Sequence, residues 1–375
     1  MTCFYRSATP ARFTTVMLPA AAPAPLVYRP GLNGIRAICV WLVVLAHWSL
    51  PGFPIGEMGR IPFFVLSGYL ISGIVWKQQV HPGAPEGWQR RLGVFYQRRM
   101  LRILPPYYLA LALGALLPLA TLREYPGWFI LPVSNLLFYR LGHWGEGVGH
   151  YWTMAVDEQF YLLWPLLLGL LGRRVGALLV VVVASVLFRI WWSLHVTPTL
   201  TFVLLPACLD MFALGGLLRI IEPQPWVRRL ARGRWVVLAW AVWAAIWALL
   251  EALHAHDIWL LISTTAGGLA SVATLNWAVQ LAGPAASGSA RLLQHPVLQW
   301  VGLRSYGCYL YHLLLVVFYQ RAVYHVFPTA ATRQFWLSPL PTVLLLTPLL
   351  LLLAAASWAW LEAPLNRVKD RLRYS

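Results

Sequence analysis

The chain has 375 residues, of which 59% are hydrophobic and only 11% are charged. This composition is typical of a polytopic membrane protein and excludes an ordinary soluble enzyme. The formal net charge of +17 would suit a nucleic-acid-binding protein, but basic residues in the short loops of a membrane protein produce the same excess.

Ten apolar runs, each close to the roughly 20 residues that a bilayer span requires, predict an all-α integral-membrane bundle of about ten transmembrane helices. These runs leave little chain for a soluble domain. We therefore predict one membrane-embedded domain over 31–366, preceded by a flexible cytoplasmic extension over 1–30 and followed by a short basic tail over 367–375. The runs are 32–50, 61–79, 103–121, 151–171, 175–194, 200–220, 235–253, 258–281, 297–319 and 339–361.

The first run carries two ionisable residues, Arg36 and His47, in an otherwise apolar stretch. On a helix, eleven residues separate them by roughly 16 Å and return them to nearly the same face. We expect Arg36 at a membrane surface and His47 near the middle of the bilayer. A lone histidine in a soluble apolar helix is usually a packed core residue, whereas an ionisable residue inside a bilayer is normally retained for function.

A basic cluster precedes the third run, after a second run whose Ser67-Gly68 pair permits close helix contact. Such a cluster could simply set the orientation of the protein or bind anionic lipid head groups. Arg99 and Arg102 are three residues apart, so they would share a face at a helix start, and arginine forks bind phosphate bidentately. The cluster consists of Arg90, Arg91, Arg98, Arg99 and Arg102.

The outer segment over 122–150 is long and rich in aromatic residues, which is common in functional loops. The fourth run then carries two acidic residues, Asp157 and Glu158, close to its outer end. These carboxylates could merely complement the helix dipole. Glu158 would nevertheless lie about 10 Å below the outer end, at roughly the depth that we expect for His47.

The basic residues are distributed unevenly between the two sides of the predicted bundle. With the N-terminus inside, six of the 29 Lys and Arg residues fall on the outer side and the other 23 fall on the inner side. This asymmetry predicts cytoplasmic termini and makes nucleic-acid binding unnecessary. The four cysteines show no disulfide framework and no metal-ligand spacing, so we expect no metal. The six outer residues are Arg60, Arg123, Arg140, Arg189, Arg321 and Arg333.

Several segments together resemble the acyltransferase 3 family of integral-membrane acyltransferases. An arginine and a histidine separated by ten residues, an RxxR pair and an EQFYLLWP segment follow one another in the order of that family. The matching pieces are LNGIRAICVWLVVLAH, PFFVLSGYLIS, FYQRRMLRILPPYY, YWTMAVDEQFYLLWPLLL, LPACLDMFALGGLL, GLRSYGCYLYH and LEAPLNR.

The resemblance implies transfer of an acyl group, usually acetyl from acetyl-CoA, to a sugar hydroxyl of a lipid-linked or exported polysaccharide at a bacterial inner membrane. It implies that His47 is catalytic and that Arg36, Arg99 and Arg102 handle the donor. Asn33 departs from the aspartate that is common in the family.

The chemistry of the residues agrees with this reading. An imidazole is suited to accept a hydroxyl proton near neutral pH, and a carboxylate behind it, for which Glu158 is the candidate, would orient it.

Three other readings remain open from the sequence. An acyltransferase could act on a small-molecule acceptor, and a transporter or flippase would also need intramembrane ionisable residues such as His47, Glu158 and Asp210. A non-catalytic membrane scaffold would leave those residues unexplained. No inverted repeat of the kind common in transporters is visible in the sequence, and the arginines gather on the side where a cytoplasmic donor would enter.

Overall fold

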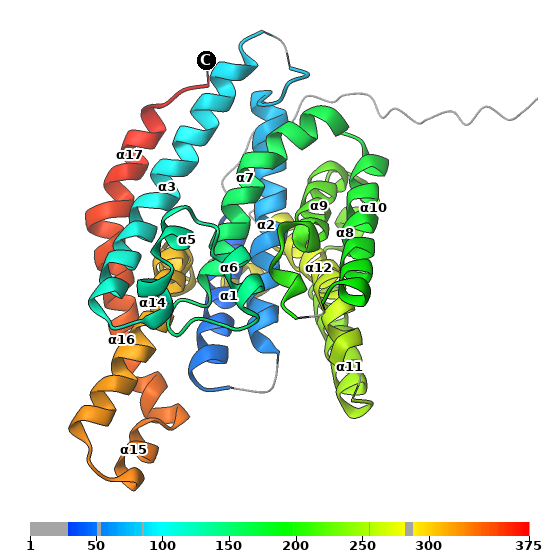
Figure 1. Ribbon diagram of the computed structural model, residues 1–375. Coiled ribbons are helices and arrows are strands. Elements are labelled where there is room, and N and C mark those ends of the chain that lie inside the picture. Colours follow the sequence, from blue (N-terminus) through cyan, green and yellow to red (C-terminus); the bar gives the residue numbers. More distant parts are fainter. Residues whose placement is uncertain are drawn as a thin grey trace, which may run out of the picture.

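The computed structural model describes residues 29–50, 54–84, 86–197, 199–254, 256–281 and 288–374, and every regular element in these ranges is a helix (Figure 1). The predicted all-α fold is confirmed. The N-terminal extension lies outside the described residues up to position 28.

Within the described ranges, ten helices have 17 or more residues, and each overlaps one of the ten apolar runs. They are α1 (Pro30–Trp48), α2 (Ile55–Gln78), α3 (Trp88–Leu116), α7 (Tyr151–Leu171), α8 (Val175–His195), α9 (Leu205–Ile221), α11 (Gly233–Ala252), α12 (His256–Gln280), α14 (Pro296–Val326) and α16 (Pro339–Ser357).

Seven described helices are long and apolar enough to cross a membrane by length and composition, which makes this an integral membrane protein. The number of about ten spans is not confirmed and stays a prediction. Short helices connect the long ones: α4 (Ala120–Glu124), α5 (Pro126–Ile130), α6 (Ser134–Leu141), η1 (Thr201–Val203), α10 (Pro225–Leu230), α13 (Gly288–Leu293) and α15 (Ala330–Trp336). The last long helix, α16, continues through a π-helical turn (Trp358–Glu362) into α17 (Ala363–Arg371).

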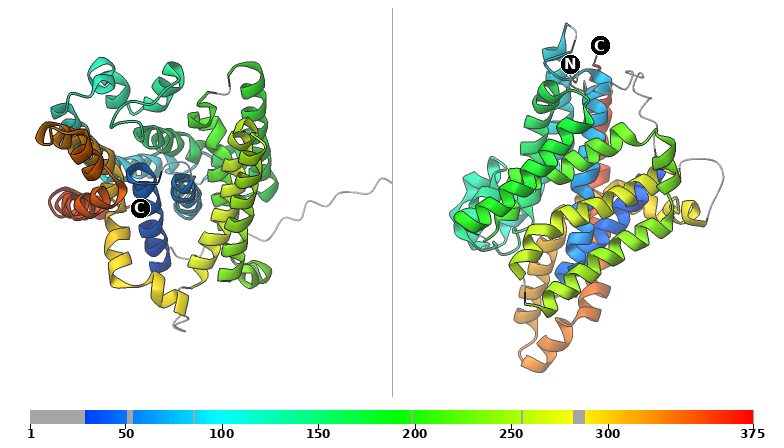
Figure 2. Two further views of the ribbon diagram at one scale, coloured as in Figure 1. Left: turned by 90° about the horizontal axis from the view of Figure 1, so that it is seen from below. Right: turned by 90° about the vertical axis from the view of Figure 1, so that its right-hand side faces the viewer.

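Helices α1 and α2 form the centre of the bundle. Helix α2 packs against α9 and α1, and α1 packs against α14. Figure 1 shows α3, α16 and α17 on one flank and α8, α11 and α12 on the other, and Figure 2 shows the same arrangement from two further directions. Helix α11 is buried over only 6% of its apolar stretch, against 67% for α2. Its apolar outer surface would therefore face lipid, whereas α2 is surrounded by protein.

Glycines set the close contact between α2 and α9. A Cβ atom at Gly68 would lie 2.0 Å from the carbonyl oxygen of Phe212, and one at Gly215 would lie 2.0 Å from that of Val65. Both separations are far shorter than any real contact, so each position needs a residue without a side chain. The close helix contact predicted from the Ser67-Gly68 pair is therefore present.

The basic cluster lies on a helix rather than in a loop. Helix α3 begins at Trp88, before the first arginine of the cluster, and extends 29 residues. The apolar run that begins at residue 103 therefore covers only the second half of this helix, because the first half carries no continuous apolar run. Arg98, within that half, donates from Nη1 to the carbonyl oxygens of Lys369 and Leu372, both at 2.7 Å. These hydrogen bonds from Arg98 hold the end of α17 against α3.

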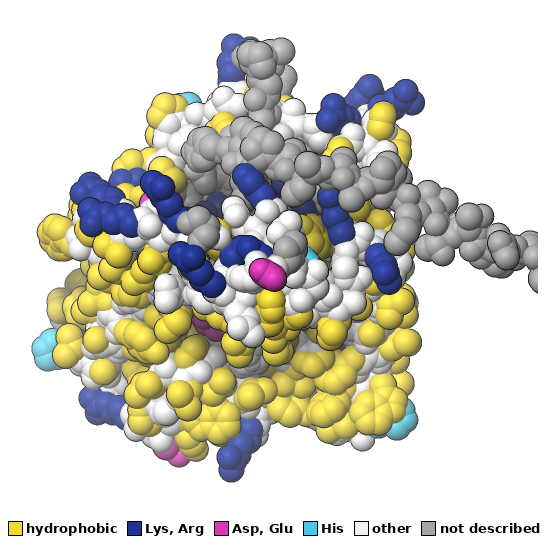
Figure 3. Space-filling view, turned by 90° about the horizontal axis from the view of Figure 1, so that it is seen from above, with side chains coloured by type: hydrophobic (Ala, Val, Ile, Leu, Met, Phe, Trp, Pro, Cys, Tyr) yellow, Lys and Arg dark blue, Asp and Glu magenta, His cyan; other side chains and the backbone are white. Residues whose placement is uncertain are grey.

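The end of the bundle that carries the C-terminus is rich in basic side chains. Figure 3 shows this face from above, with many Lys and Arg side chains both near its centre and at its edges and few acidic ones among them. Apolar side chains cover the flanks below. Such a distribution is what the positive-inside rule predicts for a cytoplasmic face.

Candidate active site

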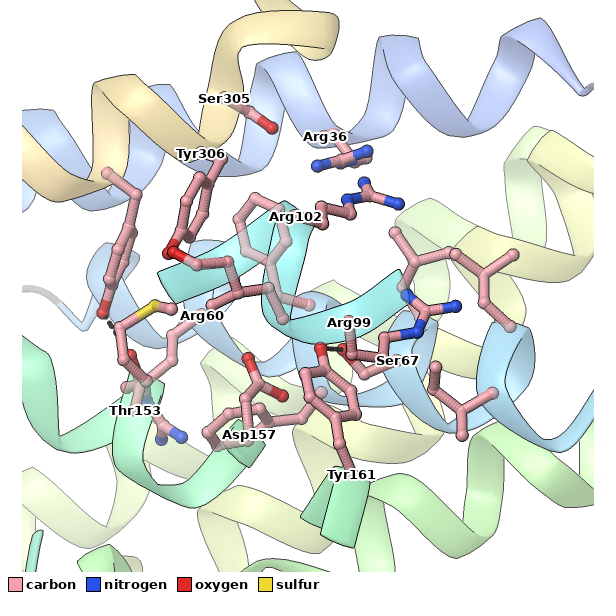
Figure 4. A pocket seen from close by; sticks show the side chains of 18 residues that line it. Arg36, Arg60, Ser67, Arg99, Arg102, Thr153, Asp157, Tyr161, Ser305 and Tyr306 are labelled. Atoms are coloured by element: carbon pink, nitrogen blue, oxygen red, sulfur yellow. Dashed lines mark hydrogen bonds between the residues drawn. The ribbon is translucent and has the colours of Figure 1, made fainter. Parts of the chain in front are cut away.

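A cavity of about 130 Å³ lies between α1, α2, α3, α7 and α14 (Figure 4). Polar and ionisable side chains from all five helices line it, although the surrounding bundle is mostly apolar. The ionisable and hydroxyl-bearing residues on its wall are Arg36, Arg60, Ser67, Arg99, Arg102, Thr153, Asp157, Tyr161, Ser305, Tyr306 and Tyr309.

The cavity brings together the three arginines that the sequence assigned to the donor. Arg36 comes from α1, whereas Arg99 and Arg102 come from α3, and Figure 4 shows Arg36 and Arg102 next to each other. Arg102 is exposed, and the other two are partly buried. Within the described part of the chain, none of the three forms a salt bridge. The carboxylates of Glu362 and Glu158 interact electrostatically with these arginines but form no salt bridge with them. Three neighbouring cations that no salt bridge neutralises form a suitable site for a multiply charged anion.

Aromatic rings hold one of these arginines in place. The guanidinium carbon of Arg99 lies 5.5 Å from the ring centre of Phe95 and 5.8 Å from that of Tyr161. The hydroxyl of Tyr161 is in turn 3.3 Å from the hydroxyl of Ser67 on α2. Cation–π contacts of this kind orient a guanidinium without neutralising its charge.

The two neighbouring acidic residues on α7 differ in whether they line the cavity. Asp157 lines the cavity and Glu158 does not. One carboxylate oxygen of each, Oδ1 of Asp157 and Oε1 of Glu158, is buried without a hydrogen-bond partner among the described residues. No hydrogen bond in that part of the chain joins Glu158 to His47 either. The structure therefore does not place Glu158 behind the imidazole, and one-residue spacing on a helix explains why the two acids face different directions.

His47 lies in the last turn of α1, and the bilayer depth that we expect for it stays a prediction. Pro30 begins the helix two residues earlier than the predicted run, and the helix ends at Trp48. The imidazole Nδ1 of His47 is 2.9 Å from the carbonyl oxygen of Val43, one turn earlier. The side chain of His47 remains exposed and is not part of the cavity wall.

Two further histidines meet near His47, and the sequence reading assigned no role to either. His312 of α14 is fully buried, and its Nε2 lies 3.2 Å from Nδ1 of His47. His150, which precedes α7, places its ring centre 4.8 Å from that of His312. A second histidine inside an apolar run was a visible signal, but its contact with a residue 265 positions away could not be read from spacing.

Hydrogen bonds connect this histidine group to the cavity. Nδ1 of His312 lies 2.7 Å from the carbonyl oxygen of Tyr309, and Tyr309 lines the cavity. The Tyr309 hydroxyl is 2.7 Å from the hydroxyl of Thr153, which also lies on the wall. The group therefore adjoins the cavity at Tyr309, while Arg36 and Arg102 lie elsewhere along its wall.

Arg60 is a fourth cation on the cavity wall, although the sequence reading counted it as an outer charge. It belongs to the second turn of α2, and its guanidinium carbon lies 5.1 Å from the ring centre of Trp152. Its Nη1 is buried without a hydrogen-bond partner among the described residues. Its assignment to the outer side of the membrane stays a prediction.

Arg189, also counted as an outer charge, is buried inside the bundle instead. It forms a salt bridge of 2.8 Å with Asp210, and both side chains are almost inaccessible. The hydroxyl of Thr265 donates to Asp210 at 2.6 Å. This group links α8, α9 and α12 and lies outside the cavity wall, so Asp210 no longer supports a transport pathway.

The aromatic residues of the outer segment and of the adjoining start of α7 are only partly available to a ligand. Tyr151 and Trp152 are buried, whereas Trp144 is 44% exposed. Trp144 packs against Trp152 with ring centres 6.3 Å apart. Most of this aromatic group therefore belongs to the protein interior, and Trp144 is its exposed member.

An all-helical integral-membrane bundle with an arginine-lined cavity and an adjoining histidine group defines a candidate membrane enzyme. The family model described as an acyltransferase domain matches residues 29–359. The chain therefore belongs to the acyltransferase 3 family, which confirms the resemblance seen in the sequence.

Curated relatives share this region of sequence. The chain is 24% identical over 331 residues to the peptidoglycan O-acetyltransferase OatA of Listeria monocytogenes, which covers 77% of this chain and 49% of the relative. It is 25% identical over 320 residues to the O-acetyltransferase OatA of Staphylococcus aureus, with 78% and 51% covered. The chain thus spans about half the length of these relatives. No solved structure matches it.

Proposed function

We propose that this protein moves an acetyl group from cytoplasmic acetyl-CoA to a sugar hydroxyl of a lipid-linked or exported polysaccharide. The observation that carries the proposal is the cavity in which Arg36, Arg99 and Arg102 meet without forming salt bridges in the described part of the chain and which adjoins a histidine group. Family membership supports acyl transfer, and the printed names of the relatives support O-acetylation of a glycan.

The arginines suit the donor. The phosphates of acetyl-CoA are multiply anionic, and guanidinium forks bind phosphate oxygens bidentately. The exposed Arg102 would hold them at the mouth, and the partly buried Arg36 and Arg99 would hold groups that reach further in. Only the narrow thioester arm then needs to enter the cavity.

The histidine suits the acceptor. In the proposed step, the hydroxyl oxygen attacks the thioester carbonyl carbon while His47 takes the hydroxyl proton. A carbon–oxygen bond forms, the carbon–sulfur bond breaks, and the imidazolium returns the proton to the departing sulfur to give free CoA. His47 therefore acts as a general base and then as a general acid, as histidine does in other acyl transfers.

The proposal places the arginine cluster and both termini in the cytoplasm of a bacterium, with the protein in the inner membrane. The basic face in Figure 3 supports this orientation. A cysteine introduced at the exposed position Gln97 of α3 should react with an impermeant maleimide only after the cells are permeabilised. Labelling in intact cells would reverse the orientation and remove the cytoplasmic donor.

The direct test uses the purified protein in proteoliposomes. Added acetyl-CoA should yield free CoA, and acetyl should appear on a glycan acceptor supplied on the other side. Mass spectra of surface glycans from cells with and without the gene would identify the acceptor. Unchanged glycans together with loss of an acetylated small molecule would favour the other acceptor class, and acetyl-CoA that remains intact would reject acyl transfer from this donor.

A further inference from the structure

The contact between His47 and His312 joins the end of α1 to the middle of α14. Nδ1 of His47 and Nε2 of His312 are 3.2 Å apart. The indole of Trp48, the next residue along α1, donates to the main-chain carbonyl of His312 at 3.1 Å. The two imidazoles are therefore held against each other by a separate hydrogen bond between the same two helices.

The partners of His312 determine which of its nitrogens carries the proton. Its Nδ1 faces the carbonyl oxygen of Tyr309 at 2.7 Å. A carbonyl oxygen can only accept, so the proton must be on Nδ1, and the neutral ring then has a lone pair on Nε2. His312 consequently presents a hydrogen-bond acceptor to His47.

The same reasoning applies to His47. Its Nδ1 faces two acceptors, the carbonyl oxygen of Val43 at 2.9 Å and Nε2 of His312 at 3.2 Å. Both contacts require a proton on Nδ1. The remaining nitrogen, Nε2, then has a free lone pair, which is the form that a general base needs.

We propose that His312 is a positioning residue that holds His47 in the tautomer with Nε2 free to accept the acceptor's hydroxyl proton. This inference rests on the proposed function of His47 as the base. When that proton arrives, Nδ1 of the imidazolium still donates to His312 and Val43, so the charged form keeps its partners. The proton afterwards passes to the departing CoA sulfur, and His47 returns to the same tautomer.

The surroundings of His312 suit a fixed support. The side chain is completely buried, and the ring of His150 packs against it edge to face. Nε2 of His150 is itself 3.2 Å from the carbonyl oxygen of Leu310. A neutral acceptor is also less costly to bury than a carboxylate in an apolar bundle. His312 therefore occupies the position that the sequence reading had assigned to Glu158.

Two amide substitutions separate this role from a general structural one. In His312→Gln, the amide oxygen reaches the place of the ring Nε2 and can accept from His47. In His312→Asn, the amide reaches only the place of Nδ1, so the bond to Tyr309 survives and the one to His47 is lost. We expect the Asn variant to lower kcat about 10- to 150-fold, the usual value of a hydrogen bond to a charged group. The Gln variant should stay within about fivefold of the parent protein, and the KM for acetyl-CoA should change in neither.

Tyr311→Phe supplies the matched control. It removes a buried hydrogen bond of 3.0 Å to Ser357, one residue away on the same helix, without touching His47, and its kcat should equal that of the parent protein. Each protein would be assayed as the full chain in proteoliposomes, and its thermal stability would be measured in parallel.

The possible outcomes distinguish this inference from the proposed function. A low kcat in the His312→Asn variant together with a near-normal kcat in the His312→Gln variant supports the positioning role. Equal kcat in Asn and Gln, whether both are low or both are normal, overturns it, because a structural residue would not discriminate between the two amides in this way. If His47→Ala itself keeps full turnover, the error lies in the assignment of the base, and the proposed function fails at that point.

Discussion

The bundle contains two regions rich in buried or half-buried arginine, and they differ in what the guanidinium groups face. The guanidinium of Arg189 donates hydrogen bonds to Asp210, to the hydroxyl of Thr265 and to main-chain carbonyls. Arg36 and Arg99, in the cavity, form no salt bridge in the described part of the chain. A buried charge is costly unless it is paired. The first region therefore contributes to the fold, and the second leaves its charges available to the anionic donor that we propose.

A further group at the basic end belongs with the first region. Glu222 accepts from Arg29 at 2.7 Å and from Arg219 at 3.1 Å, and the hydroxyl of Tyr69 also donates to it. This network joins the start of α1 to α2 and α9. The comparison thus shows that some arginines of this bundle are used up in salt bridges, whereas those on the cavity wall remain available to a ligand.

The largest effect is expected at His47, the histidine of the group that adjoins the arginine-lined cavity. His47→Ala should lower turnover by about 10²- to 10⁴-fold, because proton removal by a positioned base typically contributes that much. Binding of acetyl-CoA should stay nearly unchanged, since the arginines remain. Isothermal titration and initial-rate measurements on the same preparation would check both. Loss of donor binding with turnover per bound donor preserved would contradict the division into base and phosphate site.

The second-largest effect is expected on stability, when the buried ion pair between Arg189 and Asp210 is broken. Asp210→Ala leaves Arg189 buried without its partner, so the free energy of unfolding should fall by about 3–5 kcal/mol. The double change Arg189→Leu with Asp210→Leu should recover much of that loss, because a buried ion pair is often replaceable by apolar residues. Thermal unfolding followed by fluorescence size exclusion would measure this. A double variant as unstable as the single one would show that the pair is not the relevant unit.

A smaller effect is expected in the unpaired region. Arg99→Ala and Arg102→Ala should each weaken acetyl-CoA affinity by about 10- to 150-fold, without loss of thermal stability. Lysine at either position should restore affinity only in part, because it keeps the charge but loses the bidentate fork. Arg36→Ala should behave in the same way.

Arg98→Ala is the matched control for these variants. Arg98 neighbours Arg99 on α3, but it is already bonded to the end of α17. Its removal should loosen the C-terminal segment and leave the affinity for acetyl-CoA unchanged. If Arg98→Ala lowers the affinity for acetyl-CoA as much as Arg99→Ala does, a diffuse positive field would explain the binding better than the cavity does.

The smallest effect is expected at Glu158. The sequence reading made it the carboxylate that orients His47, but His312 occupies that place in the structure. Glu158→Gln should therefore change kcat by less than about threefold, since the substitution removes a charge that does not touch the base. A fall of about a hundredfold or more would restore the carboxylate to the mechanism and count against the positioning role of His312.

The sequence predicted the helical membrane fold well because a helix satisfies its own backbone hydrogen bonds and its apolar run is visible locally. It failed at the first half of α3, where Arg98 and its neighbours interrupt the apolar pattern although the helix continues. It could not show that Arg60 lines a cavity or that Arg189 is paired inside the bundle, since the surroundings of a charge near the end of a run depend on the packing of other helices.

For the site, the sequence by itself determined the chemistry that is present: a histidine and an arginine on α1, an RxxR pair and an acidic pair. Only the tertiary structure decided which of these meet. Arg36 joins Arg99 and Arg102 across two helices, and His47 meets His312 across 265 residues, because α1 packs against α14. Residue type and local period are properties of a short segment, whereas a contact between distant side chains depends on the packing of the whole bundle.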